Sequence, residues 1–266
     1  MAAPAPHAPF ISLVVPVLHD TAAVAALLAE SPPGPRPAWA PQRGAPTGGC
    51  LARDEWIVVN GDAADRSLDP VRASHPEVRW LDSGPGRGVQ ISTGAAAARG
   101  EWLLVLHADT RLPAGWRDEV TRAAASASYH WGCFRLRLDT SAWQARLIEG
   151  AVGWRVLLFR LPYGDQAMFF RRSMLEQLGG VPRVPLMEDV VLARRFGRRG
   201  PPYRSALPVT TSARRWERDG WWRRTGRNWW MLTRYLLGAS PDRLASAYAP
   251  EGAAPRGAST AGSEQC

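Results

Sequence analysis

The hydrophobic and polar positions of the chain alternate in a way that is typical of α/β proteins. Four short apolar runs, each ended by polar residues or glycine, predict buried strands at residues 10–15, 56–59, 78–81 and 102–106. Pro16 is expected to end the first strand. One helix is predicted after the first strand, with Val24, Leu27 and Leu28 on one face, and another over residues 91–99. Strands that alternate with helices favour a mostly parallel, doubly wound sheet.

The second half of the chain is less regular. Residues 131–138 alternate as in an antiparallel strand, and residues 167–170 form another apolar run. Helices are expected over residues 190–196 and 221–237, and the second of these is rich in arginine and tryptophan. These elements predict that a smaller, mixed part of the fold follows the parallel strands.

Three segments of the chain have the composition of loops or tails. Residues 31–50 are dense in proline and glycine and are predicted to form a surface loop. Residues 1–9 and 249–266 are polar, or rich in alanine, glycine and proline, and we expect disordered tails there.

The run at residues 102–106 stops abruptly at His107-Ala108-Asp109. In an open α/β sheet, ligands bind outside the carboxyl ends of the strands, so His107 and Asp109 are expected at the rim. Side chains of this kind can hold a hard cation together with the phosphates that it neutralises. A polar turn, in which Asp109 caps a helix that opens near Pro113, is the alternative interpretation.

The composition indicates what kind of protein this is and what kind of partner it binds. A chain of 266 residues with 45% apolar residues can bury one sizeable α/β core. The net charge is +9 and every cation is arginine, which suits a nucleotide diphosphate, a lipid surface or a nucleic acid. Three scattered cysteines form no disulfide framework or metal motif, and no signal peptide or membrane span is recognisable, so we expect a cytoplasmic protein.

Three further groups of residues are candidates for chemistry. The glycine-rich loop 84–90 precedes a helix and, with Arg87, can cradle an anion, although an ordinary turn has the same composition. Glu188 and Asp189 begin a helix, where a carboxylate either complements the helix dipole or acts as a general base. Arg215 and Trp216 belong to a basic segment that can clamp a pyrophosphate and stack on a ring, or be merely solvated.

Taken together, these segments resemble the family-2 inverting glycosyltransferases, which have a GT-A fold. The resemblance covers residues 10–248, and its segments are 16–20, 59–65, 86–94, 107–109, 188–189 and 212–216. His107-Ala108-Asp109 stands where the family has Asp-x-Asp, and Glu188-Asp189 stands where it has Glu-Asp. With Gly164-Asp165-Gln166, the set is most similar to a small bacterial subgroup described as rSAM/selenodomain-associated transferases.

The resemblance implies a GT-A type, Rossmann-like α/β sandwich over residues 10–210 and a helical extension over 211–248. It implies transfer of a sugar, with inversion, from a nucleotide-diphosphate-sugar donor to a hydroxyl acceptor. Asp109, with His107, would hold Mg²⁺ or Mn²⁺. Asp189 would be the catalytic base, with Glu188 as the alternative.

The resemblance also implies which residues contact the two substrates. The residues expected on the acceptor side are Asp165 and Gln166. The residues expected to bind the donor are Pro16, Asp20, Asn60, Asp62, Arg87, Gln90, His107, Asp109, Arg215 and Trp216.

Several positions depart from the family pattern. Asn60 replaces the aspartate expected to hold the nucleotide base, and His19 and Asp20 replace Asn and Glu. His107 replaces the first aspartate of the metal motif, which leaves Asp109 as the main metal carboxylate. Ser212 replaces the glutamine of the Gln-x-x-Arg-Trp box of processive members, so synthesis of a polymer is not expected.

Two other functions are compatible with parts of the sequence. A nucleotidyltransferase has a similar sheet and metal chemistry, but its glycine-rich signature would follow the first strand. A basic, non-catalytic module that binds membranes or nucleic acid would explain the charge but not the carboxylates at the strand ends. A nucleic-acid partner is therefore not expected.

The arginine- and tryptophan-rich helix at 221–237 has two interpretations. Its apolar face either closes the cleft as a structural lid or meets the membrane interface, where tryptophan and arginine are both favourable. The membrane interpretation has a lipid-linked acceptor as its natural companion and places the protein peripherally at the inner face of the membrane.

Overall fold

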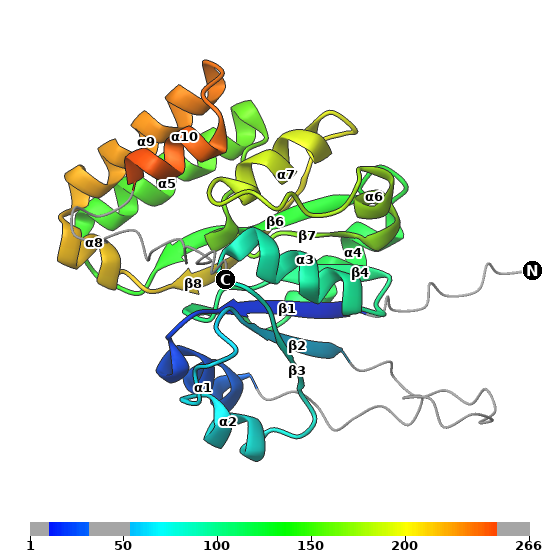
Figure 1. Cartoon of the computed structure of the whole chain (residues 1–266). Coiled ribbons are helices and arrows are strands. Elements are labelled where there is room, and N and C mark those ends of the chain that lie inside the picture. The colour runs from blue at the N-terminus through cyan, green and yellow to red at the C-terminus, as the bar shows by residue number, and fades with distance from the viewer. Residues whose placement is uncertain (1–10, 32–53, 249–266) are drawn as a thin grey trace, which may run out of the picture.

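The computed structural model describes residues 11–31 and 54–248. The tails predicted at 1–9 and 249–266, and nearly all of the loop predicted at 31–50, lie outside these residues. One mixed sheet runs through the molecule in the strand order β3-β2-β1-β4-β7-β6-β8-β5 (Figure 1). Its strands are β1 Ile11–Val17, β2 Glu55–Asn60, β3 Arg79–Asp82, β4 Trp102–Val105, β5 Thr110–Arg111, β6 Trp131–Leu138, β7 Phe169–Arg171 and β8 Tyr203–Thr211.

The first half of the sheet is parallel and the second half is mixed. Strands β3, β2, β1 and β4 run in one direction, so their carboxyl ends meet at one edge. Strand β7 is antiparallel to β4 and β6, whereas β8 is parallel to β6 and antiparallel to β5. The predicted α/β class and mostly parallel sheet are confirmed, and the buried strand predicted at 102–106 is β4.

The helices cover both faces of the sheet. They are α1 Thr21–Glu30, α2 Asp69–Ser74, α3 Arg87–Ala97, α4 Trp116–Ala125, α5 Trp143–Phe159, the 3-10 turn η1 Gly164–Gln166, α6 Arg172–Gln177, α7 Glu188–Gly197, α8 Arg214–Asp219, α9 Trp221–Leu236 and α10 Pro241–Tyr248. Figure 1 shows α1 and α2 on one side of the sheet and α3 and α7 on the other.

Alternating residues of the strands fill two cores, one on each face. Val14 and Val59 pack with Ile91 of α3 and with the buried residues of α7, whereas Leu13 and Val58 pack with α1 and α4. Because side chains of a strand alternate between faces, a continuous apolar run supplies both cores at once. This explains why β1, β2 and β4 read as largely apolar runs.

The prediction that Pro16 ends the first strand is wrong. Strand β1 continues to Val17, and Pro16 pairs with Val59 of β2. Pairing with β4 stops at Val14, whose carbonyl accepts the amide of Leu106. Pro16 is two residues further along, so its missing N–H would point beyond the last pair with β4 and costs no hydrogen bond of the ladder.

Two long elements were not predicted. Helix α5 is apolar on most of its circumference and therefore lacks the one-sided period that identifies a helix. Strand β8 contains Pro208 and mixes exposed with buried residues, because it lies near the edge of the sheet. The helix predicted over 221–237 is α9, whose last residue is Leu236. Within the described residues, no helix is long and apolar enough to span a membrane.

Candidate active site

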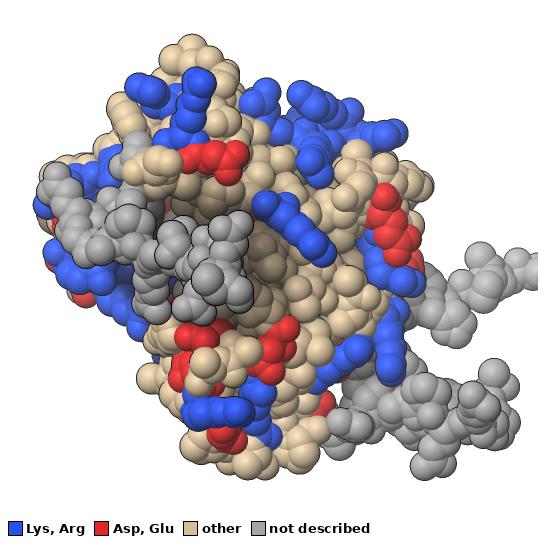
Figure 2. Space-filling view, viewed as in Figure 1, with Lys and Arg blue, Asp and Glu red and all other residues tan. Residues whose placement is uncertain are grey.

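A pocket of about 530 Å³ lies at the carboxyl ends of β1 and β4, where the sheet changes from parallel to antiparallel pairing. Figure 2 shows a hollow in the middle of this face, with acidic side chains below it and arginine above. A cleft at this edge is where open α/β sheets bind their ligands. The predicted site residues that line the pocket are Pro16, Asp20, Arg87, Gln90, His107, Asp109, Asp165, Asp189, Arg215 and Trp216.

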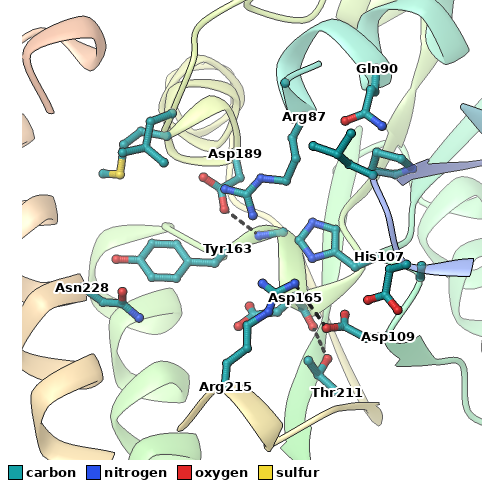
Figure 3. A pocket seen from close by; sticks show the side chains of 18 of the residues that line it. Arg87, Gln90, His107, Asp109, Tyr163, Asp165, Asp189, Thr211, Arg215 and Asn228 are labelled. Carbon is teal, nitrogen blue, oxygen red and sulfur yellow. Dashed lines mark hydrogen bonds and ion pairs between the residues drawn. The ribbon is translucent and has the colours of Figure 1, made fainter. Parts of the chain in front are cut away.

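Asp109 faces Arg215 of α8 (Figure 3). Its Oδ2 lies 3.5 Å from Nη2 of Arg215 and 3.6 Å from Nη2 of Arg214, and its side chain is 9% exposed. Arg214 also forms an ion pair with Asp20 at the end of β1. The predicted helix cap is not formed, because a short strand, β5, follows Asp109 before α4 begins at Trp116. Asp109 is therefore available to a ligand of the pocket.

His107 lies between Asp109 and Asp189 in Figure 3. Its Nε2 is buried and has no hydrogen-bond partner among the described residues. Burial, helped by the charge of Arg87, lowers the pKa of His107 to about 3, so the imidazole is neutral at physiological pH. A Cβ built on Gly164 would lie 2.6 Å from Nε2, which explains the glycine at that position.

Asp189 is held by two backbone amides. Its Oδ2 accepts the N–H of Gly164 at 2.8 Å, and its Oδ1 accepts the N–H of Val190 at 2.8 Å. Each carboxylate oxygen has a second lone pair, so the group retains acceptor capacity on the pocket side. A carboxylate fixed in this way, at the wall of a cleft, has the geometry of a general base.

Glu188, by contrast, is buried behind the pocket. Its Oε1 lies 2.8 Å from Nε of Arg87, and its side chain is 1% exposed. Burial raises the pKa of Glu188 to about 7, against the opposing charge of Arg87. Glu188 therefore supports Arg87, whereas Asp189 is the member of the pair that reaches the pocket.

Stability should fall with rising pH because of Glu188. A carboxyl group whose folded-state pKa is raised binds its proton more tightly in the folded protein, so its stabilisation is lost between about pH 4.5 and 7. The loss should approach about 3 kcal/mol, at 1.4 kcal/mol per pKa unit. Denaturant unfolding at several pH values should show a shallower decline in Glu188→Gln than in the wild type. The exposed control Glu176→Gln should keep the wild-type slope, and equal slopes in all three proteins would contradict the assignment.

Three predicted donor residues have mainly structural contacts. The Nε2 of Gln90 donates to the carbonyls of Val17 at 2.6 Å and Val59 at 2.9 Å, which ties α3 to β1 and β2. Asn60 is buried, and its Nδ2 donates hydrogen bonds to the backbone carbonyl of Asp62 and to the carboxylate of Asp82. Asn60 and Asp62 do not line the pocket, so the structure places them beside it rather than in it.

Of the two predicted acceptor-side residues, one lines the pocket and the other is buried outside it. Asp165 lines the pocket, and burial, together with the charges of Asp189 and Asp109, raises its pKa to about 6. Gln166 is buried. Its Nε2 donates a hydrogen bond to the carbonyl of Phe134, and its Oε1 accepts hydrogen bonds from the backbone N–H of Tyr163 and the guanidinium of Arg155. Gln166 thus shapes the η1 turn that presents Asp165.

Residues that the sequence analysis did not select also line the pocket. Tyr163 precedes the Gly164-Asp165 turn, and Thr211 ends β8, where its hydroxyl donates to the carbonyl of Asp165 at 3.1 Å. Arg224 and Asn228 come from α9, and Arg224 covers the ring of Trp216 at 5.0 Å. Thr211 could not be found from the sequence, because strand β8 was not predicted. Arg224 and Asn228 lie in the predicted helix, but its sequence pattern does not show which polar residues face the pocket.

Some side chains of the pocket are possible ligands of a divalent cation. The described residues contain no group of three or more His, Cys, Asp or Glu side chains that could hold a metal. The Nε2 of His107 is buried next to Gly164 and has no hydrogen-bond partner among the described residues. Asp109 fits, because Mg²⁺ is commonly held by one or two carboxylates together with the phosphates of the substrate.

Comparison with known families agrees with this geometry. The model of the family described as glycosyl transferase family 2 matches residues 50–179. This stretch, slightly less than half of the chain, is similar to glycosyl transferase family 2 domains. The match includes Asp109 and Asp165, whereas Asp189 and Arg215 lie beyond it. No curated protein matches the chain.

Similar solved structures confirm the fold. A mannosyltransferase from Pyrobaculum calidifontis, in complex with GDP-Man and Mn²⁺, has a TM-score of 0.53 and 18% identity and covers 76% of this chain and 56% of its own. Residues 1–349 of TarS from S. aureus, in complex with UDP-GlcNAc, have a TM-score of 0.55 and 12% identity and cover 76% of this chain and 58% of their own. The chain thus spans slightly more than half the length of these proteins. At such identities the likeness shows the fold, which is the predicted GT-A type.

Proposed function

We propose that the protein transfers a sugar from a nucleoside-diphosphate-sugar donor to a hydroxyl acceptor, with inversion and with the help of a divalent cation. One observation carries the proposal: a single pocket in a glycosyl transferase family 2 fold brings Asp109, Arg215 and Asp189 together. The order of the motifs supports membership of the rSAM/selenodomain-associated subgroup. The family match favours sugar transfer over nucleotidyl transfer or a non-catalytic basic module.

The donor side of the pocket is formed by Arg87, Asp109 and Arg215. A leaving nucleoside diphosphate carries negative charge, which guanidinium groups stabilise through charge-assisted hydrogen bonds. A bound Mg²⁺ or Mn²⁺ would neutralise further charge on the pyrophosphate. Asp109 is the residue that fits as its protein ligand, and Arg215, which lies 3.5 Å from Asp109 and lines the pocket, would turn to the pyrophosphate when a donor binds.

The acceptor side is formed by Asp189 and Asp165. In the proposed reaction the acceptor oxygen forms a bond to the anomeric carbon, and the bond from that carbon to the diphosphate oxygen breaks. Asp189 takes the hydroxyl proton, and the nucleoside diphosphate leaves with the bonding electron pair. Attack from the face opposite the leaving group inverts the anomeric centre.

Nucleotide binding tests the proposal directly. UDP or GDP with Mn²⁺, at about 100 times the dissociation constant, should raise Tm by roughly 5–10 °C. The matching nucleosides, which lack the diphosphate, should leave Tm unchanged. A panel of nucleotide sugars should then release nucleoside diphosphate in the presence of an acceptor. If no nucleoside diphosphate shifts Tm with or without Mn²⁺, the proposal is wrong.

A further inference from the structure

A second cavity, of about 200 Å³, lies between α5 and α9 and was not indicated by the sequence. We refer to it as the α5–α9 groove. Figure 1 shows the two helices side by side, and the rings of Trp143 and Trp222 at their first turns are 6.0 Å apart. The walls of the groove are mostly apolar, with one arginine, and include Leu136, Leu147, Ile148, Ala151, Val152, Arg155, Trp222, Thr225 and Trp229.

The groove adjoins the candidate active site. Tyr163, Asp165, Trp216 and Asn228 line both cavities. The mostly apolar groove therefore borders the acceptor side of the reaction pocket. A ligand that fits both cavities at once needs a polar end, for the carboxylates, and an apolar chain, for the groove.

The apolar stripe of the groove extends over the surface of α5. Leu147 and Ala151 line the groove, and Trp154 and Leu158 follow them at helical spacing. Trp154 is 63% exposed and Leu158 is 64% exposed, and the neighbouring Phe159 is 60% exposed. Contiguous exposed apolar side chains of this size mark an interaction surface in a soluble domain.

Helix α9 continues the same surface and adds positive charge. Trp222 and Trp229 line the groove and are about half exposed, and Leu236 follows them at helical spacing. The exposed arginines of the helix, Arg223, Arg227 and Arg234, repeat along a neighbouring stripe. Tryptophan and leucine beside arginine is the composition that favours the interface of an anionic membrane.

We propose that the acceptor is a membrane lipid, whose hydrocarbon chain lies in the α5–α9 groove and whose hydroxyl-bearing end reaches Asp165 and Asp189. This inference rests on the proposed sugar transfer and names its acceptor class. The chain enters the groove from the membrane, to which the exposed residues of α5 and α9 bind. The sugar is then transferred to the hydroxyl in the reaction pocket, and its proton goes to Asp189 as described above.

Binding of an alkyl chain in the groove can be tested with soluble amphiphiles, and this test does not require turnover. Titration calorimetry with hexyl, octyl and decyl β-glucoside, below their micelle concentrations, should show binding that tightens about fourfold for each methylene that enters the groove. Ala151→Phe places a ring in the groove from an exposed position of α5 and should weaken octyl glucoside binding by tenfold or more. Gly150→Phe adds the same ring on an exposed position outside the groove and should bind as the wild type does. Leu147→Gln is a second groove variant, and equal Tm values would show that each variant is folded.

Membrane binding can be tested with vesicles of phosphatidylcholine, with and without phosphatidylglycerol. The wild type should sediment with the anionic vesicles, and less so at high salt. A variant with Trp154, Leu158 and Phe159 all changed to serine should lose vesicle binding and keep octyl glucoside binding, because these residues lie outside the groove.

Three results would overturn the inference. The first is glucoside binding that does not depend on chain length or on Ala151→Phe. The second is the absence of binding to anionic vesicles at low salt. The third is a wild-type dimer that dissociates in the serine variant, which would assign the apolar face to a second copy of the chain. Any of these together with normal nucleotide binding rejects the lipid acceptor and leaves the proposed sugar transfer intact.

Discussion

Asp109→Ala is expected to abolish turnover, with a loss on the order of 10³-fold or more. Asp109 is the carboxylate that fits as a metal ligand, and it also orients Arg214 and Arg215. Its loss should remove the part of nucleotide binding that depends on Mn²⁺, which a titration of UDP or GDP with and without the metal measures. The side chain is part of no core cluster, so Tm without ligands should change little.

A matched control for this variant is Asp118→Ala. Asp118 is an exposed carboxylate in the first turn of α4, outside the pocket, and its replacement should leave turnover unchanged. Treatment of the wild type with EDTA should reproduce the loss seen in Asp109→Ala. Full activity of the wild type in EDTA would reject metal dependence, and with it this explanation of Asp109.

Asp189→Asn is expected to lower kcat by about 100-fold or more, because the amide cannot take the acceptor proton. The substitution is not fully conservative in this structure. Both carboxylate oxygens of Asp189 accept a backbone N–H, and the amide nitrogen of asparagine must face one of these two donors. A stability loss of about 1–2 kcal/mol should therefore accompany the loss of activity, and denaturant unfolding measures it.

The comparison with Glu188 separates the two carboxylates. Glu188→Gln removes the buried partner of Arg87, and activity should fall less than in Asp189→Asn. Donor affinity should remain within about threefold of the wild type in Asp189→Asn, since Asp189 lies on the acceptor side. If Glu188→Gln is inactive and Asp189→Asn is active, the roles of the two carboxylates are the reverse of those proposed.

The sequence by itself determined the parallel half of the fold. Residues 102–106 and the other apolar runs must be buried on both faces, and burial of such runs between helices requires strands of a parallel sheet. The same pattern placed His107 and Asp109 at a strand end, and Glu188 and Asp189 at the start of a helix. Motif order then pointed to the pocket, in which ten of the predicted residues meet.

Only the tertiary structure decided which of these side chains face the pocket. Asn60 and Gln166 have polar side chains like those of the pocket residues, but their amides form hydrogen bonds with backbone and side-chain groups outside the pocket. Glu188 and Asp189 are neighbours in sequence, yet successive helical residues point about 100° apart, so one is buried behind Arg87 and the other lines the cleft.

The α5–α9 groove was likewise invisible in the sequence. Its walls combine residues of β6, α5 and α9, which are up to about 90 positions apart, from Leu136 to Trp229. A hydrophobic pattern shows that α9 has one apolar face, but not what covers that face. In the structure, Met231 and Leu232 pack into the core while Trp222 and Trp229 remain about half exposed, so the fold buries only part of the apolar side of α9.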